Sequence, residues 1–224
     1  MKRELMVVVI GDIIGSRALD EAEREEAQEK LLEVFEQIRG ERNSLKSPHT
    51  ITLGDEFQAV YSGFSTVIDD CWKILAALHP VSVRFSISVG RIVTPINKSQ
   101  AIGMDGPAFH EARDGIEELK KTGRLFIAKI RYAEEDEKSL HVLNLMNSSL
   151  NMLSNEMLSW KKIRYQILVM INDGWPVKEI AKELNISETA VYKNRDDGDL
   201  ALIIELKNTI HALLTRELKK LSAP

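Results

Sequence analysis

The chain has 224 residues, a net charge of −4 and a single cysteine, Cys71. This length is enough for one large or two smaller domains with a real core. The charge argues against a protein that coats nucleic acid, although a local basic face is compatible with it. One cysteine excludes an internal disulfide and suits a reducing cytoplasm, and no apolar run approaches the roughly 18 residues of a membrane span. We therefore expect a cytoplasmic protein without membrane contact.

The first two thirds of the chain predict an α+β domain. An apolar run at residues 5–10 predicts a strand buried on both faces, and the alternation at 81–93 predicts a half-buried strand. Further strands are expected at 49–53, 57–61, 124–130 and 139–143, and helices at 20–39, 64–79 and 107–121. This order, β-α-β-β-α-β followed by a helix and edge strands, is typical of the ferredoxin-like fold, in which helices cover one face of an antiparallel sheet.

The last third of the chain predicts an all-α domain. Residues 146–160 are poor in charge and predict a connecting helix or linker between a domain at 1–145 and a second domain at 161–224. The segment 161–224 carries eleven Lys or Arg and nine Asp or Glu, a net charge of +2 against −6 for residues 1–160. The opposite signs favour a different partner for the second domain.

Two short segments each place an aspartate at the end of a strand. The segment VVVIGDIIGSR (7–17) presents Asp12, and HTITLGDEFQAVY (49–61) presents Asp55 and Glu56 in a tight hairpin. One or two carboxylates together with phosphate oxygens are the usual ligands of Mg²⁺ in nucleotide sites. An acidic pair at a hairpin tip is disfavoured unless water or a cation neutralises it. Each motif alone would also suit an ordinary solvated turn, but the pair predicts a metal–nucleotide site.

The turn after Asp12 has the composition of a phosphate-binding turn. Gly15 lets backbone N–H groups approach a phosphate closely, and the start of a helix favours an anion. Arg17 can add charge-assisted hydrogen bonds to phosphate oxygens. The residues expected to contact nucleotide are Ile14, Gly15, Ser16, Arg17 and Glu56.

As a set, these motifs resemble the nucleotidyl cyclase palm of class III adenylyl and guanylyl cyclases and of the related GGDEF diguanylate cyclases. The resemblance includes the strand RFSISVGRI (84–92) and the segment GMDGPAFHEARDGIEELKKTGRLFI (103–127), and it covers roughly residues 5–130. It implies metal binding by Asp12, the Ile13 carbonyl and Asp55, and triphosphate binding by the backbone N–H groups of residues 14–16. It also implies a catalytic set of Asp12, Asp55 and Arg113, with Arg113 stabilising transition-state charge, often from a partner subunit.

Three positions depart from the cyclase pattern. Class III cyclases carry an asparagine where this chain has Phe109 and a purine-reading lysine where it has Ile51, and the first glycine of GGDEF is Leu53 here. The first two departures remove the groups that orient the ribose and read the base. They therefore weigh against catalysis more than against binding of metal or phosphate.

A second motif lies in the C-terminal third. The segment 164–203 resembles helix-turn-helix regulators and sigma-factor region-four domains of the EIAxxLxISxxxV type, with Asn185–Ser187 as the turn and Ser187 as N-cap. The DNA-contacting residues that it implies are Ser187, Thr189, Tyr192, Lys193 and Arg195. Three acids just beyond them, Asp196, Asp197 and Asp199, would repel phosphates. A protein-interaction bundle therefore remains open as an alternative.

The whole chain, a cyclase-like palm followed by this motif, looks like the SatD family of bacterial proteins. The favoured hypothesis is a cytoplasmic, homodimeric regulator whose palm binds a purine nucleotide with Mg²⁺ or Mn²⁺ and whose helix-turn-helix domain binds double-stranded DNA. A second hypothesis is an active nucleotidyl cyclase that forms a cyclic nucleotide from a triphosphate. A third is a dimerisation and protein-interaction module without a ligand.

Overall fold

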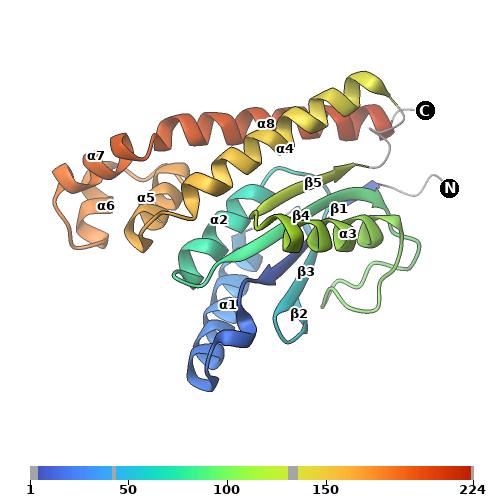
Figure 1. Ribbon diagram of the computed structural model, residues 1–224, viewed down its shortest axis with the longest axis horizontal. Coiled ribbons are helices and arrows are strands. Elements are labelled where there is room, and N and C mark those ends of the chain that lie inside the picture. Colours follow the sequence, from blue (N-terminus) through green and yellow to red (C-terminus); the bar gives the residue numbers. More distant parts are fainter. Residues whose placement is uncertain (1–4, 42–43, 131–135, 223–224) are drawn as a thin grey trace.

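A computed structural model describes residues 5–41, 44–130 and 136–222 (Figure 1). The strands are β1 (Leu5–Ile13), β2 (Leu45–Leu53), β3 (Glu56–Tyr61), β4 (Val83–Arg91) and β5 (Phe126–Ile130). The helices are the 3₁₀ turn η1 (Ser16–Ala18), α1 (Glu21–Glu41), α2 (Val67–Leu78), α3 (Pro107–Thr122), α4 (Glu137–Met157), α5 (Lys162–Asn172), α6 (Val177–Glu183), α7 (Glu188–Asp197) and α8 (Leu200–Ser222). The predicted α+β class is confirmed.

The five strands form one sheet in the order β2-β3-β1-β4-β5. Strand β1 runs antiparallel to both of its neighbours, β3 and β4, and β5 is parallel to β4. Every residue of β1 is buried, as its continuous apolar run predicts. The strand that carries Asp12 therefore lies in the middle of the sheet.

Helices cover both faces of the sheet, so the expectation of helices on one face only is wrong. The β1 residues Val7 and Val9 face the core built with α1 and α2, whereas Val8 and Ile10 face a second core built with α3. Successive strand residues point to opposite faces, and β1 is apolar at both sets of positions. The fully buried run at 5–10 thus requires a second layer, which α3 supplies (Figure 1).

The strand expected at residues 139–143 does not form, because this segment belongs to α4. Asp136 caps the helix by accepting a 3.0 Å hydrogen bond from the Ser139 N–H. The Asn147 side chain then accepts from the Ala128 N–H at 2.8 Å and donates to the Ala128 carbonyl at 2.9 Å. Helix α4 therefore covers the edge of β5. Without it, the unpaired backbone N–H and C=O groups of this edge could form hydrogen bonds with a strand of another molecule.

The C-terminal helices pack on the sheet domain rather than standing apart from it. Lys207 of α8 lies 2.7 Å from both Asp69 of α2 and Asn172 of α5, and Lys73 pairs with Asp173 at 3.1 Å. One cluster of buried apolar residues runs from β1 to α8. The segment 146–160, predicted as a connection, lies in α4 and the turn that follows it. Across the described ranges, no helix combines the length and apolarity needed to cross a bilayer.

A buried histidine marks the interior of the α1–α2 side. The His49 ring of β2 stacks on Phe35 at 4.9 Å, and its Nε2 lies 3.1 Å from the Tyr61 hydroxyl. Tyr61 in turn donates to Asp70 at 3.0 Å. Burial lowers the pKa of His49 from 6.5 to about 3, so the ring is neutral in the folded protein at neutral pH.

We expect His49 to make the protein acid-sensitive. Below about pH 6.5 the unfolded chain takes up a proton at this residue and the folded chain does not, so stability falls as the pH falls. The wild-type free energy of unfolding should drop by up to about 1.4 kcal/mol per pH unit between pH 6 and 4 relative to a His49→Phe variant. Urea titrations at several pH values measure this difference. If the free energy of unfolding depended on pH in the same way in both proteins, the lowered pKa of His49 would be contradicted.

Candidate functional site

The candidate site lies at the end of β1 on the face covered by α3. Asp12 shares that face with Ile10 and is only 4% exposed. The sheet register places Glu56 of β3 opposite Asp12 on one side and Arg84 of β4 opposite it on the other. The Arg84 Nη1 atom lies 3.1 Å from an Asp12 carboxylate oxygen. The central strand thus places the buried Asp12 carboxylate between the acidic side chain of Glu56 and the basic side chain of Arg84.

Helix α3 adds two cations to this group. The Lys120 Nζ atom lies 3.4 Å from Asp12, 3.5 Å from Glu56 and 3.1 Å from Glu117. The Arg113 Nη1 atom lies 2.9 Å from the Glu56 carboxylate. We refer to the resulting set as the carboxylate–cation cluster, and its members are Asp12, Glu56, Arg84, Arg113 and Lys120.

Sequence reasoning predicted Asp12, Glu56 and Arg113 as site residues but missed Arg84 and Lys120. The available signal for Lys120 was its spacing, since positions 113, 117 and 120 lie on one face of a helix. The resemblance to cyclases implies that Arg113 stabilises transition-state charge, often from a partner subunit. In this chain the Arg113 side chain contacts Glu56 of the same chain.

Burial makes the charge on Asp12 costly. Loss of solvation raises the pKa of Asp12 above its usual value, although the positive charges of Lys120 and Arg84 act in the opposite direction. Burial alone would lower the pKa of Lys120, but its contacts with Glu117 and Asp12 raise it. The two resident cations therefore do not fully offset the burial of Asp12, and a further positive charge would stabilise its ionised form.

The turn after β1 closes one side of the site. Gly15 has a left-handed backbone with φ 73°, which glycine adopts at no steric cost, and the 3₁₀ turn η1 follows it. The Ser16 hydroxyl donates to the Asp55 carboxylate, and the Ile13 N–H donates to the Asp55 carbonyl at 3.0 Å. The Ile14 N–H, one of the three predicted phosphate donors, is engaged by the Ser82 carbonyl at 2.8 Å.

Most of the predicted nucleotide and metal residues line a single cavity. Its volume is about 460 Å³, within the usual range of roughly 300–1,000 Å³ for small-ligand sites. The lining residues are Asp12, Ile13, Gly15, Ser16, Arg17, Asp55, Glu56, Arg84 and Lys120. Ile14 faces a neighbouring cavity instead. The structure thus brings together two motifs that lie 43 positions apart in the sequence.

The donor set at this cavity is chemically suited to a divalent cation. The carboxylates of Asp12 and Asp55 and the carbonyl of Ile13 are hard oxygen donors, and Mg²⁺ commonly takes one or two protein carboxylates with phosphate oxygens completing its shell. Within the described part of the chain, no group of three or more His, Cys, Asp or Glu side chains is arranged to hold a metal by itself. Ligand oxygens would therefore be needed, and a metal ion at Asp12 would compete with Lys120 for the carboxylate.

The second predicted site lies on α7. The predicted N-cap at Ser187 is confirmed, since its hydroxyl accepts from the Ala190 N–H at 3.1 Å. Asn185 in the preceding turn has a left-handed φ of 52°, a conformation that asparagine tolerates better than most residues. The α7 side chains of Thr189, Tyr192 and Lys193 are exposed.

Arg195, the remaining predicted DNA-contacting residue, is partly engaged within α7. Its Nε lies 2.7 Å from the Asp196 carboxylate, and its guanidinium carbon lies 4.8 Å from the centre of the Tyr192 ring. The neighbouring acid thus neutralises the charge that a phosphate contact would use.

The model of the SatD family matches residues 6–214. The chain belongs to the SatD family. No curated protein matches it. Among solved structures, two of a bacterial light-regulated adenylyl cyclase resemble the chain at 14% identity, with TM-scores of 0.43 and 0.42. Each likeness covers 57% of this chain and 43% of the cyclase chain, so the chain spans less than half the length of those proteins.

We expect Lys120 and Asp12 to be energetically coupled. The Lys120→Met substitution should lower the free energy of unfolding by about 0.5–1 kcal/mol, because a third of this side chain is exposed and solvent screens its ion pairs. In an Asp12→Asn background the same substitution should cost clearly less. Urea unfolding of the four proteins measures the coupling, with Lys121→Met on the exposed side of α3 as the control. Equal costs in both backgrounds would show that the pair contributes nothing.

Proposed function

We propose that this SatD-family protein is a regulator whose cyclase-like palm binds a purine nucleotide together with Mg²⁺ or Mn²⁺. The observation that carries the proposal is the cavity at the end of β1, which three acidic and three basic side chains line beside a left-handed glycine turn. Acids alone would favour a free metal ion, and bases alone a free anion. A mixture of both signs complements a phosphate chain that carries its own cation.

In this proposal the two signs of charge have separate tasks. Arg17 and Lys120 contact phosphate oxygens, and the backbone N–H groups of Gly15 and Ser16 approach them from the turn. Asp12 and Asp55 hold the metal ion, whose chemistry there is to neutralise phosphate charge. Lys120 exchanges its contact with Asp12 for one with phosphate, which keeps both the lysine and the carboxylate paired.

We expect triphosphates to bind only with a divalent cation and with the cluster intact. Asp12→Asn should weaken Mg²⁺-dependent binding of a nucleoside triphosphate at least tenfold, since it removes a charged metal ligand. Lys120→Met should weaken binding comparably by removing a phosphate contact. Calorimetry with and without EDTA measures both effects, and Lys121→Met serves as the matched control. Unchanged affinity in both site variants would exclude the cavity as the nucleotide site.

An active nucleotidyl cyclase is the second candidate, and the position of Arg113 favours it. This guanidinium contacts Glu56 beside Asp12, where it could stabilise charge on a reacting phosphate. Phe109 argues against cyclase activity. Its side chain is 8% exposed and packs in the α3 core, so it presents no polar group to a ribose. Mass spectrometry of the same incubations decides between the two, since a cyclic nucleotide would establish the enzyme.

The proposal extends to DNA binding by α6 and α7 as a helix-turn-helix unit in the cytoplasm. Exposed Thr189, Tyr192 and Lys193 on α7 are suited to the major groove, and helix-turn-helix proteins commonly read paired half-sites as dimers. A homodimer is therefore part of the proposal. Nucleotide would regulate the protein by binding one dimer state more tightly than another. A protein-binding bundle is the alternative for this segment.

We expect DNA binding to be weak, salt-dependent and limited by Asp196. The double substitution Lys193→Ala and Arg195→Ala should nearly abolish binding and flatten its log–log salt dependence by about one unit per lost phosphate contact. Asp196→Asn should strengthen binding, because it frees Arg195 from its ion pair. Fluorescence anisotropy on random duplexes at low and physiological salt measures both. A flat titration of the wild type at low salt would assign this segment to a protein partner.

A further inference from the structure

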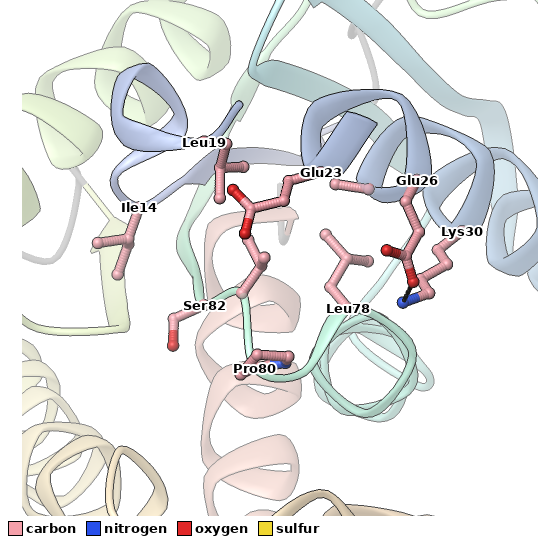
Figure 2. Close-up of a pocket in the computed structure, with 10 residues that line it drawn as sticks. Ile14, Leu19, Glu23, Glu26, Lys30, Leu78, Pro80 and Ser82 are labelled. Atoms are coloured by element: carbon pink, nitrogen blue, oxygen red, sulfur yellow. Dashed lines mark hydrogen bonds and ion pairs between the residues drawn. The ribbon is translucent and has the colours of Figure 1, made fainter. Parts of the chain in front are cut away.

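A second cavity lies between α1 and the end of α2, next to the proposed phosphate site (Figure 2). Its volume is about 550 Å³. Its lining residues are Ile14, Leu19, Glu23, Glu26, Ala27, Lys30, Leu78, Pro80, Val81 and Ser82. An apolar floor with a few polar groups at the rim is the usual composition of a site for a flat heterocycle.

The two cavities lie on either side of the turn that follows β1, and a third cavity lies between them. A third, smaller cavity of about 220 Å³ shares Ile13, Ser16, Arg17 and Asp55 with the phosphate-side cavity. It shares Leu19 and Ala27 with the cavity in Figure 2. The shared lining residues place the three cavities next to one another, so a nucleotide with its phosphates beside Gly15 would pass Leu19 to reach the face of α1.

Polar groups at the rim could discriminate between bases. Glu26 and Lys30 lie one helical turn apart on α1 and pair at 2.5 Å, with the carboxylate 63% and the ammonium side chain 31% exposed (Figure 2). Glu23 is less available, because its carboxylate accepts from the Asp20 N–H at 3.0 Å in a capping box. The rim thus offers an acceptor and a donor side by side.

We propose that this cavity binds the base of the nucleotide and that the Glu26–Lys30 pair selects guanine; the proposal rests on nucleotide binding at the adjoining site. The guanine edge presents two N–H donors, at N1 and N2, to one carboxylate and the O6 acceptor to an ammonium group. Adenine presents a single donor group beside the N1 acceptor. Guanine therefore gains one charge-assisted hydrogen bond over adenine, and its ring covers the apolar floor of Leu19, Ala27 and Val81.

Calorimetry with GTP, ITP and ATP in the presence of Mg²⁺ tests the assignment on the full-length protein. One extra hydrogen bond to a charged group predicts that GTP binds about tenfold more tightly than ATP. ITP, which lacks the N2 amine, should bind more weakly than GTP. Glu26→Gln should remove the GTP preference while leaving the affinity for inorganic tripolyphosphate unchanged, and Glu25→Gln on the opposite face of α1 should change neither.

The outcomes separate this inference from the function on which it rests. Equal binding of GTP and ATP, or a GTP preference that survives Glu26→Gln, overturns the base assignment and leaves nucleotide binding intact. Absence of binding by every triphosphate and by tripolyphosphate overturns both. Because Glu26 is largely exposed on a helix, the substitution should leave the fold unchanged, and circular dichroism with an unaltered tripolyphosphate affinity verifies this.

Discussion

The candidate site depends on one electrostatic constraint, the burial of Asp12 on the central strand of a sheet with both faces covered. A carboxylate in such a position loses most of its hydration, so its charge has to be balanced by groups of the protein or of a ligand. Arg84 provides part of the balance from the neighbouring strand and Lys120 provides part from α3. The pKa of Asp12 is nevertheless raised. The remaining imbalance is what makes this end of the sheet suited to a cation.

The position of α3 follows from unusually close packing against β4. A side chain at Gly90 would place its Cβ 2.9 Å from the Ala108 backbone nitrogen, so only glycine allows the helix to approach this strand. The Ser88 hydroxyl donates to the Ala108 carbonyl at 2.5 Å at the same contact. Close packing thus holds the start of α3 against β4, and Lys120 near the other end of the helix contacts Asp12.

Much of the site could be predicted from local sequence, because its main motifs are short and each is contiguous. The apolar run of β1, the glycine turn at Gly15 and the N-cap at Ser187 each depend on neighbours in the chain, and the structure contains all three. Partners brought by packing were not predictable in this way. Lys120 reaches Asp12 across 108 positions, and SLHVL at 139–143 alternates like a strand over too few residues to exclude a helix.

The contact of Lys207 with Asp69 and Asn172 bears on how such a chain can evolve. Modules that are exchanged between proteins generally join through exposed linkers that few contacts cross. Here a polar triad and a continuous apolar core connect α8 and α5 to α2. Substitutions on the outer face of α2 must therefore be matched on two later helices. The C-terminal helices are consequently expected to be inherited together with their sheet, which limits recombination with unrelated helical segments.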